Sequence, residues 1–327
     1  MKNNRVVSGM RPTGRLHLGH LEGVIRNWLR MQDEHECFYF VADVHALTDR
    51  YEPEDISQWS FEMIRDWLAL GIDPAKSTIF VQSHVPAHVS LATLLGMVTP
   101  VSWLERCPTY KDRVAELGSG SENLGLLAYP VLMAADVTLY GADKVPVGED
   151  QVTHLELARE VIRKFNARFP GARLVEPQPL LTSSPKLMGT DGRKMSKSYG
   201  NTVELAATAE ETQKRIRSMK TDEARKLRTD PGNPDHCNLY PYHAIYSVEQ
   251  TGEIRQGCTT AALGCVDCKK ILMDSLDRAL GEYRARRGTI SDDDVRAVMA
   301  AGARRASAAA AETMNRVAQS VGMVLPE

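Results

Sequence analysis

Up to about residue 185, the chain alternates short apolar runs with stretches of helical periodicity, and this alternation limits the fold more than any other feature. Four apolar runs predict strands, at residues 5–8, 37–41, 78–82 and 144–147. Five apolar residues between the first two runs repeat at the spacing of one helical face: Leu21, Val24, Ile25, Trp28 and Leu29. Such alternation is typical of βαβ units, so we expect an α/β fold with a parallel sheet.

Two further helices and a change of pattern set the expected domain organisation. Apolar periodicity predicts a helix over residues 55–70, closed by Gly71 in a left-handed conformation, and another over residues 150–169. In the last third of the chain, helix-forming residues dominate and no strand pattern competes. A chain of 327 residues is long enough for two domains. We therefore expect an α/β domain over residues 1–200 and an all-helical domain over residues 201–327.

Composition and charge exclude several classes of protein. The hydrophobic content of 43% and charged content of 25% are ordinary for a globular protein in water. The net charge of -2 argues against a protein that coats nucleic acid through bulk charge, so we expect no DNA partner. No apolar run approaches the roughly 20 residues that span a bilayer, and the N-terminus lacks the apolar region of a signal peptide. We expect a cytoplasmic protein without a membrane partner.

The string HLGH at residues 17–20 marks the first candidate for chemistry. It follows an apolar run and a glycine-containing turn, and it opens an amphipathic helix. A strand, a glycine turn and a helix N-terminus together favour a bound polyphosphate, because free N–H groups and the helix dipole point at it. His17 and His20 share one helical face. Taken alone, such a pair is more often a surface or capping feature.

The string KMSKS at residues 194–198 is a second candidate, far along the chain. Lys194 and Lys197 flank a flexible Met-Ser pair and can clamp the other side of a triphosphate. Read alone, this is a solvated cationic loop. Read with HLGH, it predicts a site that activates ATP at its α-phosphate.

A third candidate is an apolar helical face that ends in one carboxylate. Tyr129, Met133 and Asp136 are spaced to line one side of a helix, which suits a large aromatic ligand with a single N–H donor. The alternative is a core helix in which Asp136 is a satisfied buried polar group. The string GED at residues 148–150 fits a tight turn before a helix, where carboxylates accept ribose hydroxyls or cap the helix.

HLGH and KMSKS resemble the HIGH and KMSKS signatures of the class I aminoacyl-tRNA synthetases. With the strings at residues 40–47, 129–136 and 145–151, the chain resembles bacterial tryptophanyl-tRNA synthetases over almost its whole length. The resemblance implies a Rossmann-like nucleotide-binding catalytic domain followed by a helical domain that binds the tRNA anticodon. It also implies a homodimer that activates L-tryptophan with ATP and Mg²⁺ and transfers it to the 2′ hydroxyl of the terminal ribose of tRNA(Trp).

The same resemblance implies roles for individual residues. The catalytic residues would be His17, His20, Lys194 and Lys197, with Lys111 or Arg113 toward the pyrophosphate. The residues that hold ATP would be Arg11, Pro12, Thr13, Gly19, His20, Gly148, Glu149, Asp150, Leu187, Met188, Lys194, Met195, Ser196, Lys197 and Ser198. The residues that hold tryptophan would be Val7, His45, Tyr129, Met133, Asp136, Val145, Val147 and Gln151. Among these, Asp136 would accept the indole N–H, and His45 would lie near the substrate carboxylate.

Four cysteines in the second half predict a metal site. They are Cys237, Cys258, Cys265 and Cys268, in the pattern C-x20-C-x6-C-x2-C. In a cytoplasmic chain such a group indicates metal binding rather than disulfides, and its ligands suit zinc and an iron–sulfur cluster equally. Resemblance to the iron–sulfur subset of the family implies a 4Fe-4S cluster, with zinc as the alternative. Five nearby basic residues would contact tRNA phosphates or form a solvated helix face: Lys269, Lys270, Arg284, Arg286 and Arg287.

Two alternatives to this function stay open. A tyrosyl-tRNA synthetase shares the fold and both signatures, but Asp136 stands here with Met133 and Val147 rather than with a phenol-binding pair. A catalytically silent tRNA-binding paralogue would not need the intact histidines and lysines of the two signatures.

Overall fold

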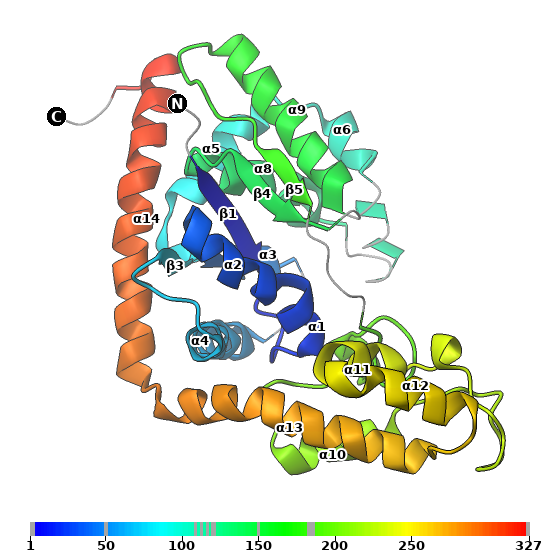
Figure 1. Cartoon of the computed structure of the whole chain (residues 1–327). Helices are drawn as coiled ribbons and strands as arrows, with labels where there is room; N and C mark the ends of the chain where they lie inside the picture. The colour runs from blue at the N-terminus through cyan, green and yellow to red at the C-terminus, as the bar shows by residue number, and fades with distance from the viewer. Residues whose placement is uncertain are drawn as a thin grey trace.

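A parallel β-sheet lies at the centre of the computed structural model, which describes residues 4–48, 52–107, 110–111, 114–115, 118, 122–148, 151–181 and 187–324. Within these residues the sheet has five strands in the order β3-β2-β1-β4-β5 (Figure 1). Their bounds are β1 Arg5–Met10, β2 Glu36–Val41, β3 Ser77–Val81, β4 Lys144–Val147 and β5 Gln178–Leu181. The four predicted strands are confirmed, with ends that shift by two residues or fewer.

The fifth strand, β5, was not predicted from the sequence. It reads QPLL and contains Pro179, a residue type that usually argues against a strand. Pro179 is tolerated here because β5 is an edge strand that pairs only with β4. The strand order therefore contains a switch between β1 and β4, where the chain changes the direction in which it adds strands.

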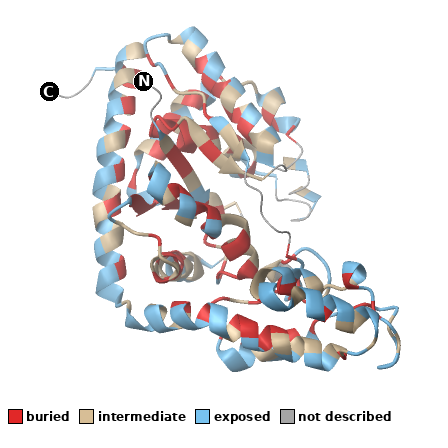
Figure 2. Cartoon of the chain, viewed as in Figure 1, coloured by how far each residue is buried: buried red, intermediate tan, exposed pale blue. Residues whose placement is uncertain are grey.

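Helices cover both faces of the sheet, and two cores result (Figure 2). Helices α2 (Arg26–Glu34) and α4 (Pro53–Leu70) pack on one face, and α5 (Ala87–Gly96), α8 (Leu124–Leu139) and α9 (Val152–Arg168) on the other. Successive strand residues point to opposite faces, so Val6 and Tyr39 enter the first core while Val7 and Phe38 enter the second.

The predicted helices agree with the structure except at one local irregularity. Helix α4 ends at Gly71, which has φ 103° as expected of a left-handed closing residue. The helix after β1 is divided into α1 (Leu18–His20), a π-helical turn η1 (Leu21–Ile25) and α2. Hydrophobic periodicity continues through η1, so no local pattern predicts this turn. π-helical turns occur frequently at functional sites.

The remaining chain is helical, and its last helix returns to the sheet. Its helices are α10 Ala209–Ser218, α11 Tyr240–Tyr246, α12 Thr251–Thr259, α13 Cys265–Thr289 and α14 Asp292–Ser320. Helix α14 runs beside β3 along one side of the molecule (Figure 1). A Cβ on Gly302 would overlap the Ile79 carbonyl oxygen, so glycine permits this close approach. The division near residue 200 stays a prediction, and α14 packs across it.

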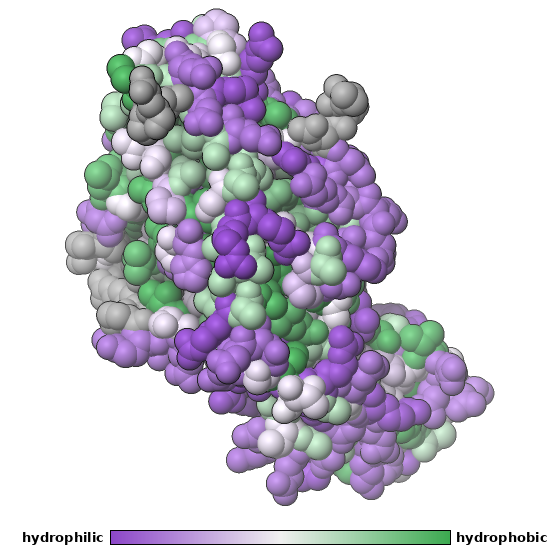
Figure 3. Space-filling view, turned by 90° about the vertical axis from the view of Figure 1, so that its left-hand side faces the viewer, coloured by the Kyte–Doolittle hydropathy of each residue, from purple (hydrophilic) through white to green (hydrophobic). Residues whose placement is uncertain are grey.

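Shorter helices complete the described chain. They are α3 Asp43–Ala46, η2 Gln82–His84, α6 Val101–Glu105, η4 Lys197–Tyr199, η5 Pro234–His236 and η6 Val248–Gln250. Seen from the side of α14, the surface is mostly hydrophilic, with hydrophobic residues between hydrophilic ones (Figure 3). Across the described ranges, no helix combines the length and the apolar character needed to cross a membrane.

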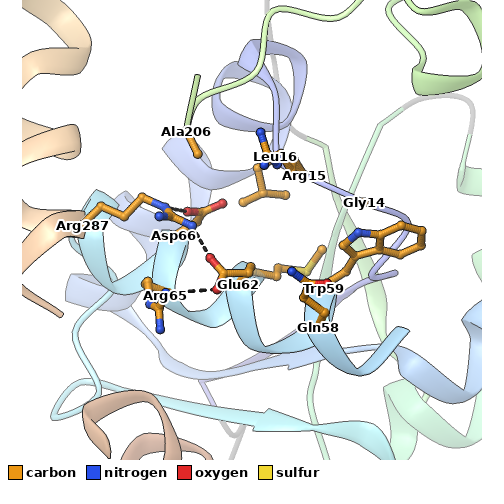
Figure 4. A pocket seen from close by; sticks show the side chains of 11 residues that line it. Gly14, Arg15, Leu16, Gln58, Trp59, Glu62, Arg65, Asp66, Ala206 and Arg287 are labelled. Atoms are coloured by element: carbon orange, nitrogen blue, oxygen red, sulfur yellow. Dashed lines mark hydrogen bonds and ion pairs between the residues drawn. The ribbon is translucent and has the colours of Figure 1, made fainter. Parts of the chain in front are cut away.

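An ionic contact joins α4 to α13 beside a cavity of about 540 Å³ (Figure 4). Asp66 on α4 accepts hydrogen bonds from Arg287 Nε at 2.6 Å and from the Tyr283 hydroxyl at 2.8 Å. Arg287 also pairs with Glu62. Burial raises the pKa of Asp66, and Arg287 and Tyr283 offset part of that effect. Asp66 therefore depends on its α13 partners to stay ionised.

Replacing Arg287 by alanine should lower the free energy of unfolding by about 2–3 kcal/mol, because it leaves the buried Asp66 without its cation. Urea unfolding followed by circular dichroism measures this change. Arg286→Ala is the matched control, since Arg286 is half exposed and pairs with an exposed Glu282. The control should cost less than about 0.5 kcal/mol. Equal losses in the two variants would contradict a special role for the Asp66–Arg287 pair.

Candidate active site

A cavity of about 480 Å³ lies at the carboxyl ends of β1 and β4, at the switch in strand order. Parallel sheets bind ligands at such a switch, because the loops on either side of it diverge. All eight residues predicted to hold tryptophan line this cavity: Val7, His45, Tyr129, Met133, Asp136, Val145, Val147 and Gln151. The fold thus brings together residues from β1, α3, α8, β4 and the start of α9.

Asp136 is the only carboxylate among the described residues that line this cavity, and it is almost fully enclosed. It shares one face of α8 with Tyr129 and Met133, as the spacing predicted. Its Oδ1 accepts from Gln82 Nε2 at 2.8 Å and from His88 Nδ1 at 2.6 Å, and its Oδ2 accepts from His45 Nε2 at 2.8 Å. Asp136 is therefore both a satisfied buried group and a group that faces the cavity.

The charge on Asp136 is set by two opposing effects. Burial alone would raise its pKa, but His45 and His88 lower the pKa to about 2 through their charges and hydrogen bonds. The side chain is therefore an ionised acceptor at neutral pH. His45 lines the cavity and hydrogen-bonds Asp136, and its place near the substrate carboxylate, which the resemblance implies, stays a prediction.

HLGH forms the start of α1, beside the same strand β1. His17 is the N-cap residue, and its backbone N–H donates to His20 Nδ1 at 3.2 Å. The pKa of His17 falls to about 4 through burial and the nearby charge of Lys197. Burial, His17 and Lys197 also hold the pKa of His20 well below its usual value. Both rings are thus neutral at pH 7 and act as hydrogen-bonding groups rather than as cations.

KMSKS lies directly against HLGH in space. The segment that follows KMSKS pairs with the residues around HLGH. The backbone N–H of Leu18 donates to the Val203 carbonyl at 3.0 Å, and the N–H of Leu205 donates to the Leu16 carbonyl at 2.9 Å. Lys197 Nζ lies 3.4 Å from the position that a Cβ on Gly14 would take. The Lys197 ammonium is buried, with no hydrogen-bond partner in the described part of the chain, and burial lowers its pKa to about 8. An enclosed cation of this kind is suited to an anionic ligand.

Asn201 fixes the KMSKS loop and was not recognised in the sequence. Its Oδ1 accepts from the Ser196 N–H at 2.8 Å, and its Nδ2 donates to the Lys194 carbonyl at 3.1 Å and to Asp191 Oδ1 at 2.7 Å. Asn201 is 2% exposed. A buried asparagine four residues after the second lysine is a local signal that pattern reading overlooked, since asparagine is usually read as a turn residue.

The structure places some of the other predicted ATP residues at the cavity and others away from it. Arg11 and Gly148 line the 480 Å³ cavity. Leu187 and Met195 are buried, and Met188 pairs with Lys194 in an isolated β-bridge. Lys111 is exposed on a short helical segment. The predictions for Arg113, Glu149, Asp150 and the side chain of Ser198 lie outside the described residues.

The four late cysteines gather near the start of α13 without forming a single-ion site. The thiol of Cys268 interacts electrostatically with those of Cys237, Cys258 and Cys265, and Cys258 does so with Cys237 and Cys265. The described residues include all four cysteines and hold no group of three or more His, Cys, Asp or Glu placed to bind one metal ion.

The five basic residues expected near tRNA phosphates have partners within the chain. Lys269 bonds to the Arg217 carbonyl, Lys270 to Asp267, Arg284 to Asp277, Arg286 to Glu282 and Arg287 to Asp66. Arg287 in particular faces α4. Contact between this helix face and tRNA phosphates stays a prediction.

Comparison with known proteins decides the family. Residues 1–281 match the family described as tRNA synthetases class I (W and Y). The chain belongs to this class I synthetase family. It is 46% identical over 327 residues to the tryptophan–tRNA ligase of Thermotoga maritima, covering 98% of this chain and 99% of that protein. The tryptophan–tRNA ligase of Ralstonia nicotianae is 40% identical over 393 residues, covering 98% of each.

Solved structures of class I synthetases share this fold. The tryptophanyl-tRNA synthetase of Campylobacter jejuni, complexed with ADP and tryptophan, has a TM-score of 0.89 at 32% identity and covers 98% of this chain and 100% of its own. The tyrosyl-tRNA synthetase of Archaeoglobus fulgidus has a TM-score of 0.66 at 21% identity and covers 87% and 90%. The second likeness concerns the fold alone, so the choice between tryptophan and tyrosine depends on the site.

Proposed function

We propose that this chain is a tryptophan–tRNA ligase, which activates L-tryptophan with ATP and transfers it to tRNA(Trp). Its relatives over nearly full length carry that name. The observation that carries the proposal is the cavity at the β1–β4 switch. There an apolar wall of Met133, Val145 and Val147 meets an ionised carboxylate, Asp136, the only one among the described residues that line the cavity. An aromatic ring with one N–H donor fits that combination.

The first step is adenylation, and the protein acts mainly by positioning and by charge stabilisation. A carboxylate oxygen of tryptophan forms a bond to the α-phosphorus of ATP, and the bond from that phosphorus to the bridging oxygen breaks, so pyrophosphate leaves with the electron pair. Lys197 and Lys194 neutralise the leaving group, and neutral His17 and His20 donate to phosphate oxygens. Mg²⁺, when bound to the phosphates, supplies further charge neutralisation.

Recognition of tryptophan combines one hydrogen bond with shape. Asp136 accepts the indole N–H, while Tyr129 and Gln151 hold the amino group. A hydrogen bond to a charged acceptor contributes about 1.5–3 kcal/mol, or roughly ten- to a hundredfold. The apolar wall must therefore supply the remaining selectivity against tyrosine and phenylalanine.

In the second step the 2′ hydroxyl of the tRNA terminal ribose attacks the adenylate carbonyl and AMP leaves. The anticodon role of the helical region, the homodimer and a cytoplasmic location stay predictions.

Amino-acid-dependent exchange of labelled pyrophosphate into ATP tests this function, followed by aminoacylation of tRNA(Trp). We expect exchange with tryptophan and at most a trace with tyrosine. Exchange with tyrosine alone would identify the sister enzyme. No exchange from a folded protein that still binds tRNA would identify a silent paralogue.

For the four cysteines we propose an iron–sulfur cluster rather than zinc. The thiols of the four cysteines interact with one another, and their pattern resembles that of the iron–sulfur subset of the family. Anaerobically purified protein should be brown and contain iron and acid-labile sulfide, and both should fall sharply in Cys265→Ser. A colourless protein with stoichiometric zinc and no sulfide would overturn this proposal.

A further inference from the structure

His88 lies behind Asp136, outside the cavity, and joins Asp136 on α8 to Tyr140, the C-cap residue of that helix. Asp136 and Tyr140 are four residues apart, so they lie one helical turn from each other. His88, from the first turn of α5, donates through Nδ1 to Asp136 Oδ1 at 2.6 Å, and its Nε2 lies 2.6 Å from the Tyr140 hydroxyl. His88 is completely buried and Tyr140 is 1% exposed.

Hydrogen-bonding rules fix the proton between His88 and Asp136. A carboxylate only accepts, so the hydrogen must lie on His88 Nδ1. The other nitrogen, Nε2, forms the hydrogen bond with the Tyr140 hydroxyl. Burial and the charge of Asp136 hold the pKa of Tyr140 well above its usual value, so its proton is retained.

Packing holds the imidazole ring in one orientation. Its centroid lies 5.6 Å from that of Phe40, 6.0 Å from Phe80 and 5.4 Å from Tyr140. The carbonyl of Tyr140 accepts from Arg5 at 3.1 Å, which ties the end of α8 to β1. A side chain locked in this way can fix a neighbouring carboxylate more firmly than a solvated partner can.

The number of donors matters for recognition. A carboxylate offers about four acceptor positions, and Gln82, His88 and His45 occupy three of those on Asp136. The remaining position is on Oδ2, the oxygen shared with His45, which lines the cavity. The geometry points to His88, held by Tyr140, as a positioning residue that leaves Asp136 one acceptor directed at an indole N–H. This inference rests on the proposed function and adds a source of its specificity.

A substrate pair that differs only in this donor tests the inference. In 3-benzothienyl-alanine a sulfur atom replaces the indole N–H, so the analogue fills the same space without donating. The readout is the ratio of kcat/KM for tryptophan to that for the analogue, measured by pyrophosphate exchange. His88→Leu should lower kcat/KM for tryptophan about 10- to 100-fold, since it removes a donor to a charged acceptor. It should change the value for the analogue less than about threefold, because no hydrogen bond is lost there.

Two milder variants and a control complete the test. His88→Asn keeps a donor near the Nδ1 position and should restore most of the ratio. Tyr140→Phe removes one hydroxyl and should lower the ratio by about three- to tenfold. His84→Leu, at an exposed histidine four residues earlier, should leave it unchanged. An equal loss for both substrates, or no loss in any variant, would overturn the inference. A wild-type protein that activates neither substrate would instead refute the proposed function.

Discussion

Asp136→Asn should lower kcat/KM for tryptophan-dependent pyrophosphate exchange by about 100- to 1000-fold. Two losses add up to this effect. The indole N–H loses an ionised acceptor, and the new amide places its own N–H donors against the three side chains that donate to the carboxylate: Gln82, His88 and His45. Buried donors left without an acceptor carry a further penalty of about 1–3 kcal/mol. The loss should appear largely as a higher KM for tryptophan.

Binding of ATP provides the internal control for this variant. Asp136 does not touch the HLGH–KMSKS side of the site, so the Kd for ATP should change by less than about threefold. Met133→Leu is the matched variant on the same helical face, because it keeps apolar volume without touching the carboxylate. Exchange by Asp136→Asn at close to the wild-type rate would show that another group reads the indole N–H.

Lys197→Met should lower kcat for adenylation by about 100- to 1000-fold, the usual loss when one preorganised charge is removed from a transition state. The KM for tryptophan should stay almost constant, since the lysine faces the phosphates. Exchange kinetics with each substrate varied in turn separate the two effects. Lys76→Met is the control, because Lys76 is half exposed and pairs with Asp33 far from the site. A similar fall in both variants would remove Lys197 from the mechanism.

The pH dependence of the wild-type protein gives a second measurement on Lys197. Burial lowers its pKa to about 8, so the ammonium is charged below that pH and loses its charge as the pH rises through it. The value of kcat/KM for ATP reports the free enzyme and should therefore decline above about pH 8. Lys197→Arg keeps its charge throughout this range and should lack the decline. A wild-type profile that stays flat to about pH 9.5 would contradict the assignment.

Much of the fold follows from local patterns. The predicted strands and the α4 boundary agree with the structure, because period-two and period-3.6 patterns reflect which side of each element is buried. Local patterns did not predict the β5 strand or the π-helical turn η1, since Pro179 argues against a strand and η1 keeps helical periodicity. The packing of α14 against β3 depends on the close fit at Gly302, which no local pattern reveals.

By itself the sequence determined the chemistry that this chain carries: two histidines at a helix start, two lysines in a loop, and an apolar face that ends in Asp136. Spacing alone places such residues on one face or at one terminus. Only the tertiary structure decided what surrounds them. His45, Gln82 and His88 meet Asp136 from three other elements, and Asn201 fixes the KMSKS loop. The physical reason is that packing between distant segments determines these partners, whereas a sequence pattern records burial only within its own segment.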